Sequence, residues 1–116
     1  MAIAITAEKN SLATKYGTDA PYAALFTADP GTSGTVVGEV TGGAPAYARK
    51  AVSWGAAANG VVTGSVTFDV PASTTITFAG VCSAATGANL LDKAAVTSQA
   101  FATQGTYTLT LTYTQS

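Results

Sequence analysis

The sequence contains no histidine, and Cys82 is its single cysteine among 116 residues. Histidine is the commonest general base and the commonest metal ligand in proteins, so its absence excludes a Ser-His-Asp or Cys-His arrangement within this chain. One cysteine can form no intramolecular disulfide, and it cannot supply the Cys/His cluster that a zinc site needs. Cys82 follows Val81 in an apolar segment without a neighbouring base, so we interpret it as a small core residue.

Charged side chains are also scarce. Five basic and six acidic residues make up 9% of the chain, whereas an average domain has roughly 25%. Arg49-Lys50 is the only adjacent basic pair, so the chain offers no cluster of positive charge for a nucleic-acid backbone or an anionic membrane surface. The formal net charge of −1 leaves little repulsion between copies, which favours a protein that assembles with others.

Long apolar runs and clustered carboxylates are missing as well. No run approaches the roughly 18 residues of a membrane span, and the apolar residues 2–5 are too short for the core of a signal peptide. The six carboxylates, which mostly stand at turns or at the ends of expected elements, are Glu8, Asp19, Asp29, Glu39, Asp69 and Asp92. Their spacing indicates neither a glycosidase carboxylate pair nor a calcium loop, so we expect no enzyme activity, no metal and no cofactor.

One segment near the N-terminus has the features of a helix, residues 3–16. Thr6 can cap it, Glu8 falls in its first turn, and Gly17 can end it. A helix of about ten residues is marginal on its own and needs a surface to dock on. We therefore expect residues 1–17 to form a helical arm that lies on the sheet edge or reaches a neighbouring copy.

From residue 21 onward the pattern favours strands, because threonine is abundant and apolar residues alternate with it. The expected strands, with 36–40 as a weak edge strand or loop and 90–96 as an ambiguous segment, are 22–28, 36–40, 47–54, 62–70, 74–83, 90–96 and 106–114. In the last of these, Tyr107, Leu109, Leu111 and Tyr113 share one face, opposite threonines. The chain is thus predicted to be mostly β: one domain over residues 1–116, an antiparallel β-sandwich or small barrel of about seven strands with one short N-terminal helix.

In the expected strand 74–83, Ile76, Phe78 and Cys82 are predicted to share one face. Two further groups of side chains admit alternative interpretations. Trp54 and Tyr47 could form a platform for a carbohydrate or peptide, although a core tryptophan is the favoured reading.

Arg49 and Lys50 are adjacent, so a strand sends them to opposite faces. One of them could pair with an acidic group across an interface. Equally, the two could be solvated charges that keep an edge strand from aggregating.

Several strings of residues occur in an order that resembles a family of small virion proteins of tailed phages, chiefly those of actinobacterial hosts. They are LFTADPG (25–31), EVTGG (39–43), YARK (47–50), VSWG (52–55), VTFDVPA (66–72) and TITFAGV (75–81). Members of this family are described as tail fibre-like or minor structural proteins, and some decorate the head. The resemblance covers residues 22–113 and implies a non-enzymatic virion role on a β-sandwich.

From this resemblance we expect a head decoration protein that stabilises the capsid, made in the host cytoplasm and bound to the outer surface of the major capsid protein. A homo-oligomer is expected, with a trimer as the first choice. The alternative is a tail fibre-associated or receptor-contacting minor tail protein, and a small carbohydrate-active enzyme is a third, disfavoured possibility. The residues predicted to form the interface are Leu12, Tyr16, Val36, Val37, Arg49 and Lys50.

Overall fold

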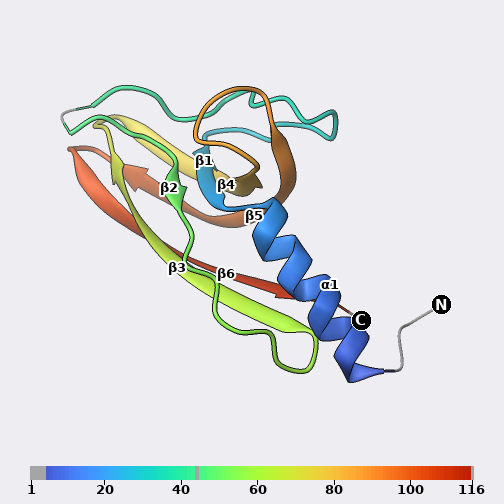
Figure 1. The fold of residues 1–116 in the computed structure, drawn as a ribbon. Helices are drawn as coiled ribbons and strands as arrows, with labels where there is room; N and C mark the ends of the chain where they lie inside the picture. The colour runs from blue at the N-terminus through green and yellow to red at the C-terminus, as the bar shows by residue number, and fades with distance from the viewer. Residues whose placement is uncertain (1–4, 44, 116) are drawn as a thin grey trace.

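Two antiparallel sheets and one N-terminal helix make up the structure, a computed structural model that describes residues 5–43 and 45–115 (Figure 1). The elements in chain order are α1 (Thr6–Asp19), β1 (Tyr22–Phe26), β2 (Lys50–Ala51), β3 (Val61–Val70), β4 (Thr74–Cys82), β5 (Leu90–Phe101) and β6 (Gly105–Thr114). One sheet has the order β2-β1-β4-β5, and the other contains β3 and β6. The predicted mostly-β class is confirmed, and the architecture resembles a sandwich, not a closed barrel.

Strands β3 to β6 form one long hairpin ribbon that is folded in half. Val61 pairs with Thr114 and Val70 with Gly105, and beyond the fold Thr74 pairs with Phe101. The register therefore continues across the corner, where residues 71–73 face 102–104. Pro71 cannot donate a ladder hydrogen bond, and Ser73 has a positive φ of 59°, so the ribbon bends there and its two halves stack (Figure 1).

The five residues of β1 complete the larger sheet and lie almost wholly inside the molecule. Ala23 and Leu25 contribute to the main core between the sheets, whereas Ala24 and Phe26 point to the opposite face. All four have 0% exposure. A strand that is buried on both faces reads as a continuous apolar run, which explains why the segment YAALF does not alternate.

The main core contains the side chains that the alternation places on one face of β3. Val66, Phe68 and Val70 are buried there against Leu109 of β6, which confirms the predicted inward face. In β4 the prediction that Ile76, Phe78 and Cys82 share a face is wrong.

A register shift between Ile76 and Phe78 reverses the pattern in β4. Ile76 packs in the main core, while Phe78 and Cys82 join the cluster on the opposite face of the sheet. Between these pairs β4 has one residue, Thr77, whereas β5 has three, 96–98, so the ladder is irregular at the point where the two faces of β4 change over.

The helix differs from its predicted bounds at both ends. Residues 3 and 4 lie outside the described residues, Ile5 occupies the N-cap position without a side-chain cap, and Thr6 is already helical. Gly17 does not end α1, because the helix continues to Asp19. A Cβ at Gly17 would lie 3.1 Å from Trp54, so this glycine lets the helix approach that ring closely.

Six strands are present in the described part of the chain, compared with about seven expected. The weak segment 36–40 is a loop with one bridge, Phe26 to Glu39, and the expected strand 47–54 is reduced to Lys50–Ala51. The ambiguous segment 90–96 is the first half of β5, which has 12 residues. Within the described ranges, no helix is long and apolar enough to cross a membrane.

Candidate functional site

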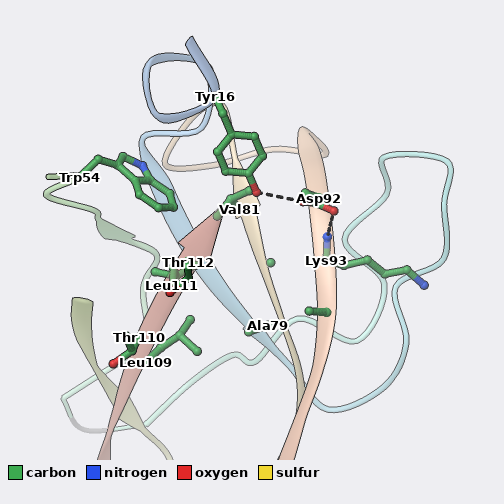
Figure 2. Close-up of a pocket in the computed structure, with 12 residues that line it drawn as sticks. Tyr16, Trp54, Ala79, Val81, Asp92, Lys93, Leu109, Thr110, Leu111 and Thr112 are labelled. Atoms are coloured by element: carbon green, nitrogen blue, oxygen red, sulfur yellow. Dashed lines mark hydrogen bonds between the residues drawn. The ribbon is translucent and has the colours of Figure 1, made fainter. Parts of the chain in front are cut away.

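A cleft of about 210 Å³ opens between the two sheets where β5 and β6 diverge (Figure 2). The helix end and the segment that carries Trp54 stand at its rim. The lining residues are Tyr16, Trp54, Ala79, Gly80, Val81, Asp92, Lys93, Ala94, Leu109, Thr110, Leu111 and Thr112. They come from α1, the β2–β3 connection, β4, β5 and β6, so the lining is brought together by the folded ribbon and by the packing of two segments that precede it.

The floor of the cleft is apolar. Ala79 and Val81 of β4 are 5% and 2% exposed. Ala79 belongs to the main core, and Val81 is paired with Ala23 of that core, so both face the main core side of the larger sheet. Ala79 pairs with Ala94 and Val81 with Asp92 on the neighbouring strand β5. Directly opposite residues of an antiparallel pair share a face, so Ala94 and Asp92 extend this surface to the exposed edge of the sheet.

Strand β6 borders the cleft with its main-chain edge. Leu109 and Leu111 point toward the core, while Thr110 and Thr112 have exposed side chains on the outer face. Among the strands of the described residues, β6 pairs with β3 alone. Its second edge therefore presents unpaired main-chain N–H and C=O groups beside an apolar floor, which is the arrangement that accepts an added strand.

Three aromatic rings close one end of the cleft. Tyr16 stacks on Tyr113 with ring centroids 3.9 Å apart. Tyr16 and Trp54 pack in a T-shaped arrangement with ring centroids 5.8 Å apart. The indole Nε1 of Trp54 donates a hydrogen bond to the carbonyl of Ala20 at 3.0 Å. These contacts fix the end of α1 on the sandwich, so the rim of the cleft is pre-organised.

Tyr16 also crosses the mouth of the cleft. Its hydroxyl donates to Oδ2 of Asp92 at 2.9 Å, as the dashed line in Figure 2 shows. Burial of the ring and the adjacent carboxylate both disfavour the phenolate, so the pKa of Tyr16 is raised far above its usual value of 10.0. At neutral pH this phenol is therefore a hydrogen-bond donor and not a base.

Lys93 belongs to the cleft by its main chain only, because its side chain extends away from it (Figure 2). Its ammonium group forms an ion pair with Asp29 of the turn that follows β1. The hydrogen bond from Lys93 lowers the pKa of Asp29, and the main-chain N–H of Gly31 assists. The cleft itself is thus left with one carboxylate, Asp92, and no nearby ammonium group from Lys93.

A second polar cluster surrounds Arg49 on the far side of β1. Arg49 is 8% exposed, and Nε and Nη2 donate to the two carboxylate oxygens of Glu39 at 2.8 and 2.9 Å. It also donates to Asn89 Oδ1 and to the carbonyls of Ala84 and Gly87. The guanidinium group therefore joins the loop after β1 to the tip of the hairpin between β4 and β5.

This cluster gives Arg49 a role that neither sequence interpretation contained. The group is neither a solvated edge charge nor free to pair across an interface, because its acidic partner is Glu39 of the same chain. Lys50 points the other way, is partly exposed and lies 4.0 Å from Asp69. The predicted platform of Trp54 and Tyr47 does not form, since Tyr47 stacks near Phe68 while Trp54 packs on Tyr16.

The remaining predicted interface residues lie on α1 and on the loop after β1, and their role in an interface stays a prediction. Leu12 is half-buried on α1, Val36 packs near the cluster of Phe26, and Val37 is 65% exposed on the loop. Of the six predicted residues, only Tyr16 lines the cleft. Residue patterns do not single out Asp92 and Ala94 as parts of a site. The one signal in that segment is the charged pair Asp92-Lys93 among uncharged residues.

Groups suited to covalent or metal chemistry do not gather in the described ranges. No three side chains of His, Cys, Asp or Glu lie close enough there to hold a metal ion. Cys82 is fully buried, and loss of hydration raises the pKa of its thiol. The thiol is thus kept protonated and away from solvent, which is the state of a core residue.

Comparison with known protein families identifies a match over most of the chain. The family described as Podophage GP4 fiber I protein gp80 matches residues 10–113. No curated protein and no solved structure matches the chain. The matched range includes Tyr16 and Trp54 and every strand but the last residue of β6.

Proposed function

The chain belongs to the Podophage GP4 fiber I protein gp80 family, a family of phage fibre proteins, and we propose from this that it is a non-enzymatic structural subunit of a tail fibre. The observation that carries the proposal is the match over residues 10–113, which takes in nearly the whole folded domain. This membership supports the tail fibre alternative better than the expected head decoration role. The expected partner, the major capsid protein, and the expected place on the outer capsid surface gain no support from it.

The geometry of the chain is consistent with a subunit that works through protein contacts. The cleft offers an apolar floor and an unpaired strand edge, and the uncharged threonine face of β6 adds no repulsion between neighbours. Such a subunit contributes to the fibre through its contacts with neighbouring proteins and needs no reactive group.

Imaging of phage particles that carry a label on this protein tests the proposal. We expect label on the tail and a copy number of a few to some tens per particle, measured from quantified virion bands. A label spread over the head, with hundreds of copies and a loss of capsid heat resistance on deletion, would contradict the fibre role and restore the decoration role.

A further inference from the structure

Strand β6 has the same order of residues in both chain directions. From residue 106 to residue 114 its sequence is TYTLTLTYT, a palindrome centred on Thr110. When such a strand pairs antiparallel with a copy of itself about Thr110, each residue lies opposite one of its own type. Threonine meets threonine, leucine meets leucine and tyrosine meets tyrosine, so the strand is complementary to itself.

The main-chain groups of these threonines point to the free edge of β6. The N–H of Gln115 donates to the carbonyl of Gly60 at 2.8 Å, in register with the ten residue pairs of β3 and β6. Hydrogen bonding alternates along an antiparallel strand, so the odd-numbered residues of β6 bond to β3 and the even-numbered residues face away from it. The even-numbered residues from 106 to 114 are all threonines, and the palindrome centre Thr110 is one of them.

We propose that β6 pairs antiparallel with β6 of a second copy of this chain, about a twofold axis at Thr110. The dimer then has one continuous sheet of four strands in the order β3-β6-β6-β3, with the main chain of Thr110 bonded to Thr110 of the second copy. Such a contact is isologous, because the same surface serves both copies. The inference concerns how copies associate, and it goes beyond the fibre role without depending on it.

Strand β6 lacks the devices that keep an edge strand from pairing with another chain, which are charged side chains, proline and bulges. Residues 105–114 contain no charged residue and no proline. Their register with β3 runs through ten pairs without a shift. A long, regular and uncharged edge of this kind is a template for a further strand.

The other long edges in the described part of the chain are protected. β5, at the end of the larger sheet, carries Asp92 and Lys93, and two register shifts interrupt its pairing with β4. The second edge of β3 is partly covered, because the N–H of Gly55 donates to the carbonyl of Thr63 at 2.8 Å. This contrast distinguishes β6 as the edge that is open to a partner.

The cleft gives the added strand room at the centre of the register. Residues 109–112 of β6 line it, and they include the palindrome centre (Figure 2). Leu111 is only partly buried in one copy. In the dimer it lies opposite Leu109 of the second copy, on the inner side of the sheet, and apolar pairs that are directly opposite stabilise a sheet.

The interface is small, which sets the expected affinity. Ten paired residues extend over about 34 Å at about 3.4 Å per residue, and the two copies meet along one strand edge. Such an edge buries less than the roughly 800 Å² per partner of a standard interface. We therefore expect a dissociation constant in the micromolar range, with monomers at low concentration.

Sedimentation velocity of the full-length protein over a range of concentrations tests the proposal. Wild type should pass from monomer to dimer as the concentration rises. Thr110→Lys places two lysines opposite each other at the twofold axis and should raise the dissociation constant at least about fivefold, because like charges directly opposite repel. Ser65→Lys is the matched control, since Ser65 is exposed and pairs with Thr110 from β3. It adds the same charge one strand away from the axis and should dimerise like wild type.

A charge exchange tests the register itself. Thr110→Glu alone should also dimerise poorly, whereas an equal mixture of Thr110→Lys and Thr110→Glu should form a heterodimer at least as readily as wild type, because each lysine then meets a glutamate. Thr110 is exposed, so both variants should keep the thermal unfolding midpoint of the wild type.

Three results overturn the proposal. The first is a wild type that stays monomeric throughout or forms trimers without dimers. The second is equal behaviour of Thr110→Lys and Ser65→Lys, and the third is a mixture that associates no better than either charged variant alone. All three leave the position of the protein on the phage unaffected, so they are separable from failure of the fibre role.

Discussion

Two side chains of this protein form hydrogen bonds with residues that are far away in the sequence. Arg49 binds Glu39, Asn89 and two carbonyls of the hairpin tip, and Tyr16 binds Asp92, 76 residues away. The side chain of Arg49 is 3% exposed, so its buried charge is stable only because Glu39 and the carbonyls surround it. A buried charge that loses its partner is costly, whereas an exposed pair contributes little.

Replacement of Arg49 by Ala should therefore lower the free energy of unfolding by about 3–5 kcal/mol. Glu39 loses its cationic partner and keeps only the hydrogen bond from the Tyr47 hydroxyl, and three acceptors of the hairpin tip lose their donor. Denaturation in urea, followed by the fluorescence of Trp54, measures the change. Lys50→Ala is the control. The Lys50 side chain is partly exposed and lies 4.0 Å from Asp69, so its replacement should change stability by less than about 1 kcal/mol.

Tyr16→Phe keeps the stacked ring and removes only the hydrogen bond to Asp92. At pH 7 it should lower the free energy of unfolding by about 1 kcal/mol. The folded pKa of Tyr16 is raised above the unfolded value of 10.0, so the unfolded chain loses this proton first. The stability that the phenol contributes is thus complete below pH 10 and falls as the pH rises above it.

The difference in the free energy of unfolding between wild type and Tyr16→Phe should accordingly narrow as the pH rises above 10 in urea titrations, because the variant lacks this ionisation. Other tyrosines are present in both proteins, so their effects cancel in the difference. If the difference in the free energy of unfolding stays constant as the pH rises above 10, then Tyr16 has the same pKa in the folded and the unfolded chain.

At the scale of elements, the ribbon of β3 to β6 depends on close approach between β4 and β5. Gly80 of β4 lies where an added Cβ would come within 2.8 Å of the carbonyl oxygen of Asp92 and 2.6 Å of Leu90 Cδ1. The leucine can rotate away, but the main chain of β5 cannot move without disturbing the ladder. The same strand carries Asp92 and Ala94 into the cleft, so the shape of the cleft depends on this glycine.

Gly80→Ala should lower the free energy of unfolding by about 1–3 kcal/mol through overpacking. Gly55→Ala provides the comparison, because a Cβ there meets nothing closer than the carbonyl of Thr63 at 3.6 Å. It should change stability by less than about 1 kcal/mol. Thermal unfolding of both variants distinguishes a specific clash from a general effect of glycine replacement, which would lower both midpoints equally.

At the scale of the whole molecule, stability is unevenly distributed. β1 is covered on both faces and lies between β2 and β4, whereas α1 buries Ala13 alone among its described side chains. The extents of 47 × 26 × 23 Å reflect the elongated ribbon with the helix beside its open end (Figure 1). Regions with few buried contacts open locally, while the interior of a sheet opens only on global unfolding.

Amide hydrogen exchange should show this gradient. The ladder amides of β1 should exchange with a free energy within about 1 kcal/mol of global unfolding, and those of α1 should exchange through smaller openings. Mass spectrometry of peptides from a wild-type sample at low concentration provides the measurement. Equal protection in α1 and β1 would mean that the helix and the sheet unfold as one unit.

Several features of this protein follow from the sequence by itself. The alternation at Val66, Phe68 and Val70, and at Leu109 and Leu111, predicts strands and their inward faces, because the side-chain period of a strand is a local property. The absence of His and the single Cys exclude a Ser-His-Asp or Cys-His arrangement and a Cys/His zinc site within this chain, because composition too can be read without the fold. Neither inference requires knowledge of what lies across the core.

Only the tertiary structure decides which distant residues meet. The cluster of Arg49 joins segments 10 and 40 residues apart, and Tyr16 meets Asp92 because the ribbon folds at residues 71–73. The register shift after Ile76 reverses the faces of β4, and no local pattern marks it. The cleft exists because the sheet of two strands, β3 and β6, covers a sheet of four strands. The number of strands in each sheet depends on strand pairing, and pairing is set by contacts between residues far apart in the chain.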